Sequence, residues 1–442
     1  MLHVHLVSLG CARNLVDSEV MTGLLVADGF QMTDDPEIAD AVIINTCGFI
    51  EDAVTESIET ILDLARYKEE GRLRYLIVVG CLAERYQKDI AASLPEVDLF
   101  LGTGAYDQVS AALKKLENQT LSAGIICPSP ASLPLQEAHT PRLIDSSHMA
   151  YVKIAEGCSS RCTYCIIPKL RGAHRSREIA DIRQECVTLL ASGIREIVLV
   201  AQESTFYGVD LAPPVGLDTL LEDLAAIDKT ARFRVLYGHP LSLNDRMIQV
   251  MGRHENICAY FDLPVQHASP SVLRKMGRSY DTDFLRSLFQ RIRNAIPDAA
   301  IRTTLITGFP GETEGDFQCL YDFINDIRFD HLGVFVYSDA DDLPSHHLPD
   351  HVPAEVAAAR QDRLMARQAE ISLEKNQKHL NKTYTILVEE HPEESLYIGR
   401  TVFQAPEVDG VTIVRGKALV VGDFTEVHIT DASEYDISGE AI

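Results

Sequence analysis

Short runs of apolar residues alternate with stretches of helical periodicity along the first third of the chain. The apolar runs cover residues 3–8, 41–45, 75–79 and 97–101, and the helical stretches between them lie near 17–28, 51–67 and 84–93. Each strand–helix unit is about 35 residues long, the length of a βαβ crossover. Continuous apolar strands are typical of a parallel sheet that is covered on both faces. The pattern therefore predicts a parallel-sheet α/β domain over residues 1–120.

The same alternation resumes after a linker at residues 121–143. Apolar runs predict six strands, with helical patterns such as 181–191 and 284–295 between them; the runs are 149–155, 196–201, 233–237, 259–265, 300–306 and 331–337. Six β/α units indicate an open (β/α)₆ relative of the TIM barrel over residues 144–352. Active sites in such folds lie at the carboxyl ends of the strands.

The last quarter of the chain has a different pattern. A charged helical segment at residues 353–380 connects the predicted barrel to a final region, 381–442. There, short alternating runs at 383–388, 397–403, 411–414 and 425–429 predict a small antiparallel β-barrel. The fold class is therefore α/β, with three successive domains.

Composition narrows the class of protein. The 442 residues are 46% hydrophobic and 24% charged, which is ordinary for a globular protein. We expect no membrane segment and a cytoplasmic location, because the chain has no 18-residue apolar run and no cleavable leader pattern. Ten cysteines spread along the chain favour metal or redox chemistry over a disulfide framework.

The net charge of the chain indicates which kinds of partner it can be expected to bind. The formal charge is −25, which argues against a general nucleic-acid binder. From residue 376 onward, 12 acidic residues face 5 basic ones, a local net charge of −7. We therefore expect no direct sequence-specific binding of nucleic acid.

The strongest chemical motif is Cys158-Ser-Ser-Arg-Cys162-Thr-Tyr-Cys165, directly after a predicted strand. Closely spaced thiolates on one loop suit an iron–sulfur cluster, and the missing fourth ligand would leave one iron open. The alternatives are a zinc loop and a chance grouping of three cysteines, but zinc normally takes a fourth Cys or His in a paired arrangement. The spacing, with Tyr164 before the last cysteine, resembles the radical S-adenosylmethionine (SAM) superfamily.

Three further cysteines follow the first three strongly apolar strands. Cys11, Cys47 and Cys81 occupy equivalent positions, and parallel crossovers bring strand ends to one edge. Each alone is explained as a small buried apolar residue. Three together predict a second three-cysteine cluster site.

Other candidate residues carry weaker signals. Polar groups at the barrel strand ends are Gln202, Glu203, His239, Gln266 and His267, with a glycine-rich loop at 307–313. His239 precedes a proline and is better explained as a loop residue than as a catalytic one. Gly308 and Gly311 either form a turn or let a ligand approach. The basic run 171–177 is either a solvated face or an anchor for the SAM carboxylate or the substrate. The loop with His346, His347 and His351 is expected to be exposed to solvent. The remaining cysteines are expected to be structural; they are Cys127, Cys186, Cys258 and Cys319.

Several of these stretches together resemble the methylthiotransferases over essentially the whole chain. The matching segments are 8–14, 17–19, 44–50, 78–81, 156–168, 171–172, 175–177 and 308–312. That family has an N-terminal three-cysteine domain, a radical SAM barrel and a TRAM β-barrel. The surroundings of Cys11 and Cys47 look like the RimO type, which modifies an aspartate of ribosomal protein S-twelve, more than the tRNA-modifying MiaB type.

The resemblance implies the cofactors and the reaction. One [4Fe–4S] cluster on Cys158, Cys162 and Cys165 would bind SAM and cleave it to a 5′-deoxyadenosyl radical. That radical would take hydrogen from the β-carbon of the aspartate, a carbon that no protein base ionises at neutral pH. A second [4Fe–4S] cluster on Cys11, Cys47 and Cys81 would hold or deliver the sulfur, and a second SAM would give the methyl group. No protein side chain is singled out as catalytic.

The resemblance also implies partners. These are S-twelve, free or in the small ribosomal subunit, an electron donor such as flavodoxin or ferredoxin, and a sulfur donor. One segment departs from the family: residues 338–344 replace an expected Gly-Thr-Pro loop after the sixth strand. Two alternatives stay open, a tRNA adenosine methylthiotransferase and a non-catalytic iron–sulfur protein.

Overall fold

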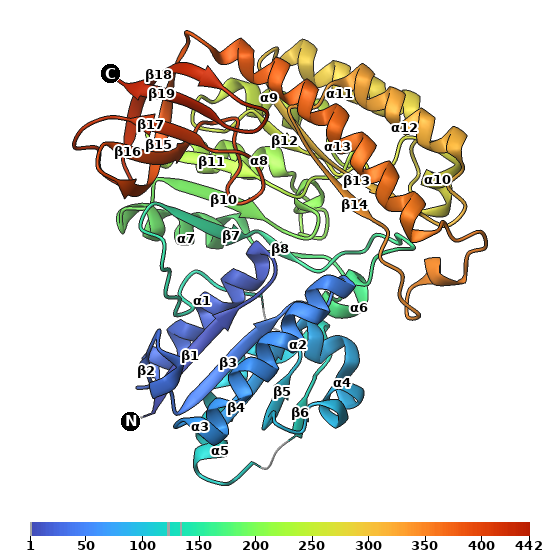
Figure 1. Ribbon diagram of the computed structural model, residues 1–442. Helices are drawn as coiled ribbons and strands as arrows, with labels where there is room; N and C mark the ends of the chain where they lie inside the picture. The colour runs from blue at the N-terminus through green and yellow to red at the C-terminus, as the bar shows by residue number, and fades with distance from the viewer. Residues whose placement is uncertain (1, 122–123, 133–134) are drawn as a thin grey trace.

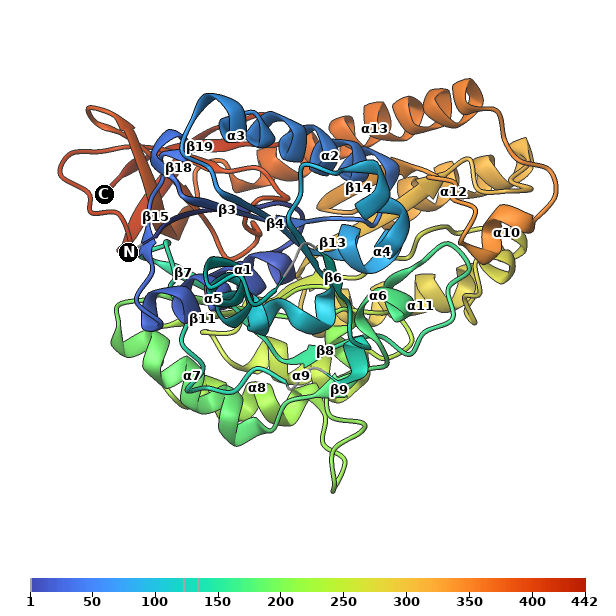
Figure 2. The same cartoon turned by 90° about the horizontal axis from the view of Figure 1, so that it is seen from below.

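The computed structural model describes residues 2–121, 124–132 and 135–442, which form three successive units (Figure 1). The N-terminal unit lies across one side of the central barrel, and Figure 2 shows it from below. The C-terminal unit lies against another side of the barrel. None of the helices in these described ranges is long and apolar enough to cross a membrane.

The N-terminal unit is a six-stranded parallel sheet in the order β2-β1-β3-β4-β5-β6. Its strands are β1 (His3–Ser8), β2 (Gln31–Met32), β3 (Ala41–Thr46), β4 (Tyr75–Gly80), β5 (Leu99–Leu101) and β6 (Gly124–Ile126). Every residue of β3 is buried, because helices cover both faces of the sheet. This confirms the parallel α/β prediction and adds two edge strands, β2 and β6, that are too short or too polar to show a pattern.

The helices divide between the two faces of this sheet. Apolar residues of α1 and α5 pack on one face, and those of α2 and α4 pack on the other. The helices are α1 (Ala12–Ala27), α2 (Glu51–Ala65), α3 (Tyr67–Glu70), α4 (Cys81–Ser93) and α5 (Val109–Glu117), with a 3₁₀ turn η1 (Pro36–Ile38) before β3 and another, η2 (Thr103–Gln108), before α5. Helix α1 is buried on its far side as well, since Ala12 and Val16 join the core inside the central barrel.

Six parallel strands build the central barrel, as the sequence pattern predicts. They are β7 (Met149–Lys153), β10 (Glu196–Val200), β11 (Arg232–Val235), β12 (Tyr260–Asp262), β13 (Ala300–Thr307) and β14 (His331–Val336). They form two three-stranded parallel sheets, β11-β10-β7 and β12-β13-β14. A bridge between Phe233 and Ile257 continues the ladder from β11 to the segment before β12.

Helices surround these strands, and their apolar faces form one large core with the strands. They are α7 (Ile179–Ala191), α8 (Leu217–Ala225), α9 (Asp245–Arg253), α10 (Pro270–Lys275), α11 (Thr282–Ala295) and α12 (Glu314–Ile327). Thr313 begins α12 with a capping box: its side chain accepts from Asp316 N–H, and the Asp316 carboxylate accepts from Thr313 N–H. After β7, a two-residue ladder of β8 (Ala155–Glu156) and β9 (Arg175–Ser176) brackets the short helix α6 (Ile167–Arg171).

The long helix α13 (Ala354–Asn376) runs from the barrel to the C-terminal unit, a closed β-barrel. The barrel strands are β15 (Thr383–Glu393), β16 (Leu396–Arg400), β17 (Thr412–Arg415), β18 (Phe424–Ala432) and β19 (Ile437–Ala441). The predicted small barrel is confirmed. It is antiparallel except where β17 pairs with β19, which run parallel.

A loop of the C-terminal barrel, residues 400–411, closes the amino-terminal end of the central barrel. Arg232 and Arg234 of β11 donate to backbone carbonyls of Arg400, Thr401 and Val402. Tyr260, the first residue of β12, donates to Asp409 at 2.6 Å. Ala405 packs into the barrel interior. The opposite end, where the strands finish, stays available for a functional site.

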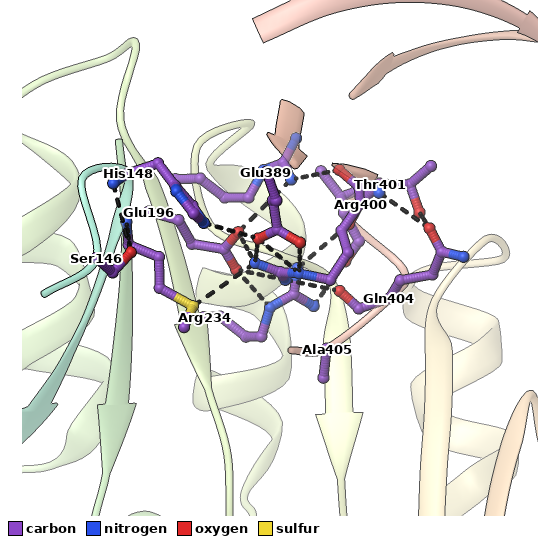
Figure 3. Close-up of polar contacts among 12 residues, drawn as sticks. Ser146, His148, Glu196, Arg234, Glu389, Arg400, Thr401, Gln404 and Ala405 are labelled. Carbon is purple, nitrogen blue, oxygen red and sulfur yellow. Dashed lines mark hydrogen bonds and ion pairs between the residues drawn. The ribbon is translucent and has the colours of Figure 1, made fainter. Parts of the chain in front are cut away.

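Buried charges hold this closure together (Figure 3). The carboxylate of Glu196, which is fully buried, accepts from Arg234 at 2.7 Å and from Arg400 at 3.2 Å. Arg400 also donates to Glu389 at 2.8 Å. Three arginines around Glu196 lower the pKa of its carboxyl to about 2 against the effect of burial, so the group is ionised at neutral pH.

Candidate active site: two cysteine triads around one cavity

Cys11, Cys47 and Cys81, the N-terminal triad, each follow one of three adjacent parallel strands. Cys11 precedes α1, Cys47 comes directly after β3, and Cys81 is the first residue of α4. Since β1, β3 and β4 are neighbours in the sheet, their carboxyl ends bring the three thiols to one edge. The thiols lie close enough to influence one another electrostatically.

Two glycines make this close approach possible. A Cβ added to Gly10, whose φ is +92°, would lie 2.9 Å from the Cβ of Cys47. A Cβ added to Gly48 would lie 2.9 Å from the backbone carbonyl of Cys81. Larger residues at these positions would push the three cysteine loops apart.

The barrel triad, Cys158, Cys162 and Cys165, lies on the loop between β8 and α6. The loop is fixed at its start because Cys158 N–H donates to the Gly172 carbonyl at 3.0 Å. In its middle, Thr163 donates through its N–H to Met276 and through its hydroxyl to Lys275. The three thiols therefore project from a backbone that the barrel holds at both positions.

Both triads line a single cavity of about 290 Å³. All six cysteines that the sequence singles out contribute to its wall. Much of the remaining wall comes from barrel strand ends, from α1 and from α6. The sequence predicts two separate cysteine triads, and in the structure both line the same cavity.

Electrostatics differ between the two triads. Burial raises the pKa of Cys81 to about 11 and that of Cys165 to about 12. At Cys11, burial raises the thiol pKa, but Arg13 and Arg171 outweigh it, so the pKa is lowered. Positive charge thus outweighs burial at the Cys11 thiol but not at the Cys81 and Cys165 thiols.

The basic run 171–177 is not a solvated face, so that reading is wrong. Arg171 and Arg177 are only 4% and 3% exposed, because acidic groups of α1 and β8 cover Arg171 and acidic groups of α7 cover Arg177. Arg177 donates to Glu185 and Asp181, each at 2.6 Å. Arg171 donates to Asp17 of α1 at 2.7 Å and lines the cavity.

Polar groups at the barrel strand ends divide into two sets. Gln202, Glu203, His239 and Gln266 line the cavity. Burial lowers the pKa of His239 to about 4, so its ring is neutral at physiological pH. His267 is buried elsewhere, where its Nδ1 accepts from Ser269 N–H at 2.9 Å.

The glycine-rich loop is a turn. The carboxylate of Glu312 accepts from the N–H groups of Gly308 and Phe309, and Lys275 donates to the Gly311 carbonyl. Of the two readings of this loop, the structure therefore favours the turn.

The wall also includes Arg13, Tyr237 and Arg278, which were not singled out as candidates from the sequence, and Tyr164, which was noted there only as the aromatic residue before Cys165. The guanidinium of Arg13 lies 4.3 Å from the ring centre of Tyr237 and donates to the Ala201 carbonyl. Arg278 donates to the Tyr164 hydroxyl at 2.6 Å. Tyr237 has a φ of 62°, a strained conformation for a tyrosine, and such outliers cluster at functional sites. No pattern in the sequence predicts this backbone conformation of Tyr237.

The atypical segment 338–351 connects the barrel to the N-terminal unit. Asp342 accepts from Arg85 of α4 at 2.6 and 3.1 Å. Arg85 also donates to the carbonyls of Gly48 and Phe49, next to Cys47. The segment thus holds the Cys47 loop against the barrel, a role its sequence does not reveal.

The histidines of the loop after β14 and the four cysteines outside the two triads do not line the cavity. His346 pairs with Asp339 at 2.9 Å, while His347 and His351 are exposed. Cys186 and Cys258 are buried in apolar cores, Cys319 packs against one, and the Cys127 thiol lies 3.7 Å from the Ala83 carbonyl. These placements agree with structural or surface roles.

The donor set fits clusters better than single ions. Within the described ranges, no group of three or more His, Cys, Asp or Glu side chains is arranged to hold one metal ion. Each triad instead offers three free thiols at the wall of a shared chamber. Thiolates are the protein ligands of iron–sulfur clusters.

Comparisons with known proteins match all three units. Family models match residues 3–102 (Uncharacterized protein family UPF0004), 152–324 (Radical SAM superfamily) and 382–442 (TRAM domain). The chain is 51% identical over 439 residues to a protein of Desulfosudis oleivorans named ribosomal protein uS12 methylthiotransferase RimO, with 99% of both chains covered. Proteins with the same name from Clostridioides difficile and Geobacter sulfurreducens are 46% and 44% identical, with at least 98% of each chain covered.

Solved structures share the fold at low identity. The radical SAM methyltransferase TsrM from Kitasatospora setae, with cobalamin and a [4Fe-4S] cluster bound, aligns with a TM-score of 0.59 at 14% identity. That alignment covers 78% of this chain and 74% of TsrM. The cobalamin-dependent SAM radical enzyme OxsB aligns with a TM-score of 0.54 at 14% identity, over 84% of this chain and 56% of OxsB.

Proposed function

The chain belongs to the RimO family of ribosomal protein uS12 methylthiotransferases, and from this premise we propose how its own residues serve that reaction. It is a radical SAM enzyme that transfers a methylthio group to uS12 (S-twelve), and its cofactors are SAM and [4Fe–4S] clusters. We propose that the modified atom is the β-carbon of an aspartate, an unactivated position that calls for radical chemistry.

The observation that carries the proposal is the shared cavity with six free thiols in its wall. We propose that Cys11, Cys47 and Cys81 hold one cluster and that Cys158, Cys162 and Cys165 hold the other, which binds SAM. Support comes from the convergence of the first three at one sheet edge and from the tight loop that carries the second three.

When bound, the clusters and SAM supply the electron, the carbon radical, the sulfur and the methyl group. The protein's own part is to bind and orient. Helix α1 and the strand ends of the barrel form the walls, and the amino-terminal end of the barrel is closed by the loop 400–411. Substrate therefore approaches from the carboxyl ends of the strands, where both triads lie.

Three finer points rest on chemistry. We propose an electron donor such as flavodoxin or ferredoxin and a separate sulfur donor, because SAM cleavage consumes an electron and each product consumes a sulfur atom. A cytoplasmic location follows from a ribosomal substrate. The acidic C-terminal barrel, with 12 acidic and 5 basic residues from position 376, favours a basic protein partner over RNA.

We further propose sequence boundaries for the functional units. Residues 1–120 form the domain of the N-terminal triad, 121–143 a linker, 144–352 the SAM barrel, 353–380 the connecting helix and 381–442 the TRAM barrel. The cavity depends on the first and third of these together, since each contributes one triad.

Mass spectrometry of cells that lack and then regain the gene tests the function. We expect a methylthio mass shift on the uS12 aspartate that follows the gene, with tRNA nucleosides unchanged. A shift that follows the gene in tRNA adenosine, with uS12 unmodified, would overturn the substrate assignment.

A further inference from the structure

Arg171 belongs to the barrel in sequence but reaches the N-terminal triad in space. It ends α6, six residues after Cys165, so the backbone that carries the barrel triad also carries this side chain. The Nη2 atom of Arg171 lies 3.8 Å from the Sγ atom of Cys81, within hydrogen-bond distance for sulfur. The side chain is 4% exposed.

The guanidinium is fixed by groups from both domains. From α1, Asp17 accepts from Nη1 at 2.7 Å and Asn14 accepts from Nη2 at 2.5 Å. From β8, the Glu156 carboxylate lies 3.7 Å from Nη1. These partners leave the guanidinium little freedom to turn away from the sulfur.

A second cation balances the two carboxylates. Lys153 donates to Asp17 at 2.6 Å and to Glu156 at 3.0 Å, and both carboxylates are at most 7% exposed. Two cations and two anions therefore lie together out of water. Loss of the Arg171 charge would leave net negative charge beside Cys81, where little solvent screens it.

Hydrogen bonds to ligand sulfurs, and nearby charge, set the reduction potential of an iron–sulfur cluster. Reduction adds one electron, taken from an external reductant, and one unit of negative charge to the cluster. A fixed guanidinium next to a ligand sulfur stabilises that reduced state and keeps its own protons.

We propose that Arg171 is a positioning residue for the N-terminal cluster: it holds Cys81 through an N–H···S contact and raises the reduction potential of that cluster. This inference rests on the proposed function, because it requires a cluster on Cys11, Cys47 and Cys81. Arg171 of α6 would thus act on the cluster of the N-terminal domain, although the loop directly before α6 carries the barrel triad.

The test isolates the N-terminal cluster in the full-length chain. In a background with Cys158, Cys162 and Cys165 replaced by Ala, anaerobically reconstituted protein is titrated with dithionite and followed by electron paramagnetic resonance. We expect Arg171→Gln to lower the one-electron reduction equilibrium constant about tenfold, which corresponds to a potential about 59 mV more negative. Arg171→Lys, which keeps the charge but loses the planar fork, should lower the constant by less.

Arg142→Gln is the matched control. Arg142 is 6% exposed and also joins α1 to the barrel, through Glu19 at 2.9 Å and Glu185 at 2.8 Å, and none of its hydrogen-bond partners among the described residues is a cysteine. Its loss should leave the potential unchanged. If Arg142→Gln shifts the potential as much as Arg171→Gln does, the effect is general to the interface and the inference is wrong.

The outcomes separate the inference from its premise. If the background protein with Arg171 intact binds no cluster, the proposed ligands fail. If it binds one and both Arg171 variants keep the wild-type potential, only the role of Arg171 is overturned. Should Arg171→Gln lose the cluster altogether, Arg171→Lys decides: a lowered potential supports the proposal, and an unchanged one contradicts it.

Discussion

At the scale of single residues, the site depends on ion pairs between segments that are far apart in the sequence. Arg85 and Asp342 are 257 positions apart, yet their side chains meet at 2.6 Å. Arg171 and Asp17 are 154 positions apart. The partners in such pairs are far apart in the sequence, so no local pattern connects them. The roles of Arg171 and of the segment 338–344 could therefore not be assigned before their partners were located. The convergence of the cysteines was predictable, because the close spacing of one triad and the strand-end positions of the other are local signals.

The Arg85–Asp342 pair gives a prediction about the coupling of the two triads. In Asp342→Asn, Arg85 loses its ionic partner, so the Cys47 loop is held less firmly against the barrel. We expect about tenfold less methylthiolated uS12, because small misplacements at reacting groups are costly. Cleavage of SAM to 5′-deoxyadenosine, which we propose takes place at the barrel triad, should change little.

The measurement is the ratio of methylthio product to 5′-deoxyadenosine under a fixed reductant. Asp341→Asn, a change of the same charge at the exposed neighbouring position, serves as the control. An unchanged ratio in Asp342→Asn would show that the pair does not position the site.

At the scale of elements, the apolar patterns predicted most strands and the order of the three units. The runs at 41–45 and 75–79 are strands β3 and β4, which helices cover on both faces. Weakly patterned elements were missed, such as β2 with two residues and β19, which pairs with β17 in parallel. The loop 400–411 was also unpredictable, since its fit to the end of the barrel depends on backbone carbonyls that bind Arg232 and Arg234.

The closure of the barrel by this loop gives a second prediction. Glu196→Gln leaves Arg232, Arg234 and Arg400 around a neutral group, and loss of one partner from a buried ion pair is strongly destabilising. We expect the free energy of unfolding at pH 7 to fall by about 3 kcal/mol. Glu374→Gln, which removes a surface partner of Arg328, should cost less than about 1 kcal/mol.

The effect of Glu196 should depend on pH in a defined direction. Its pKa is about 2 in the folded chain and 4.5 ordinarily, so its stabilising contribution is complete above about pH 4.5 and is lost as the pH falls toward 2. The stability difference between wild type and Glu196→Gln, measured by urea unfolding, should therefore narrow between pH 5 and pH 3. A difference that stays constant over this range would contradict an ionised, ion-paired Glu196.

At the scale of the whole molecule, the three units build one chamber and close its far end. The N-terminal sheet brings one triad, the central barrel brings the other, and α1 packs against both. The sequence predicted that Cys11, Cys47 and Cys81 would converge at one sheet edge but not that they would share a cavity with the barrel cysteines. That relation depends on how α1 docks on the barrel, through contacts such as Lys153 with Asp17.

The two cysteine triads that line one cavity are central to the proposed function, and replacing one of them tests it most directly. In full-length protein with Cys11, Cys47 and Cys81 changed to Ala, reconstituted anaerobically with iron and sulfide, we expect about half of the wild-type iron, since one of two clusters is lost. With reductant and SAM, the variant should still form 5′-deoxyadenosine, while mass spectrometry of uS12 should detect no methylthio group. Methylthiolated uS12 made by this variant, or loss of all of its iron, would contradict the two-cluster site.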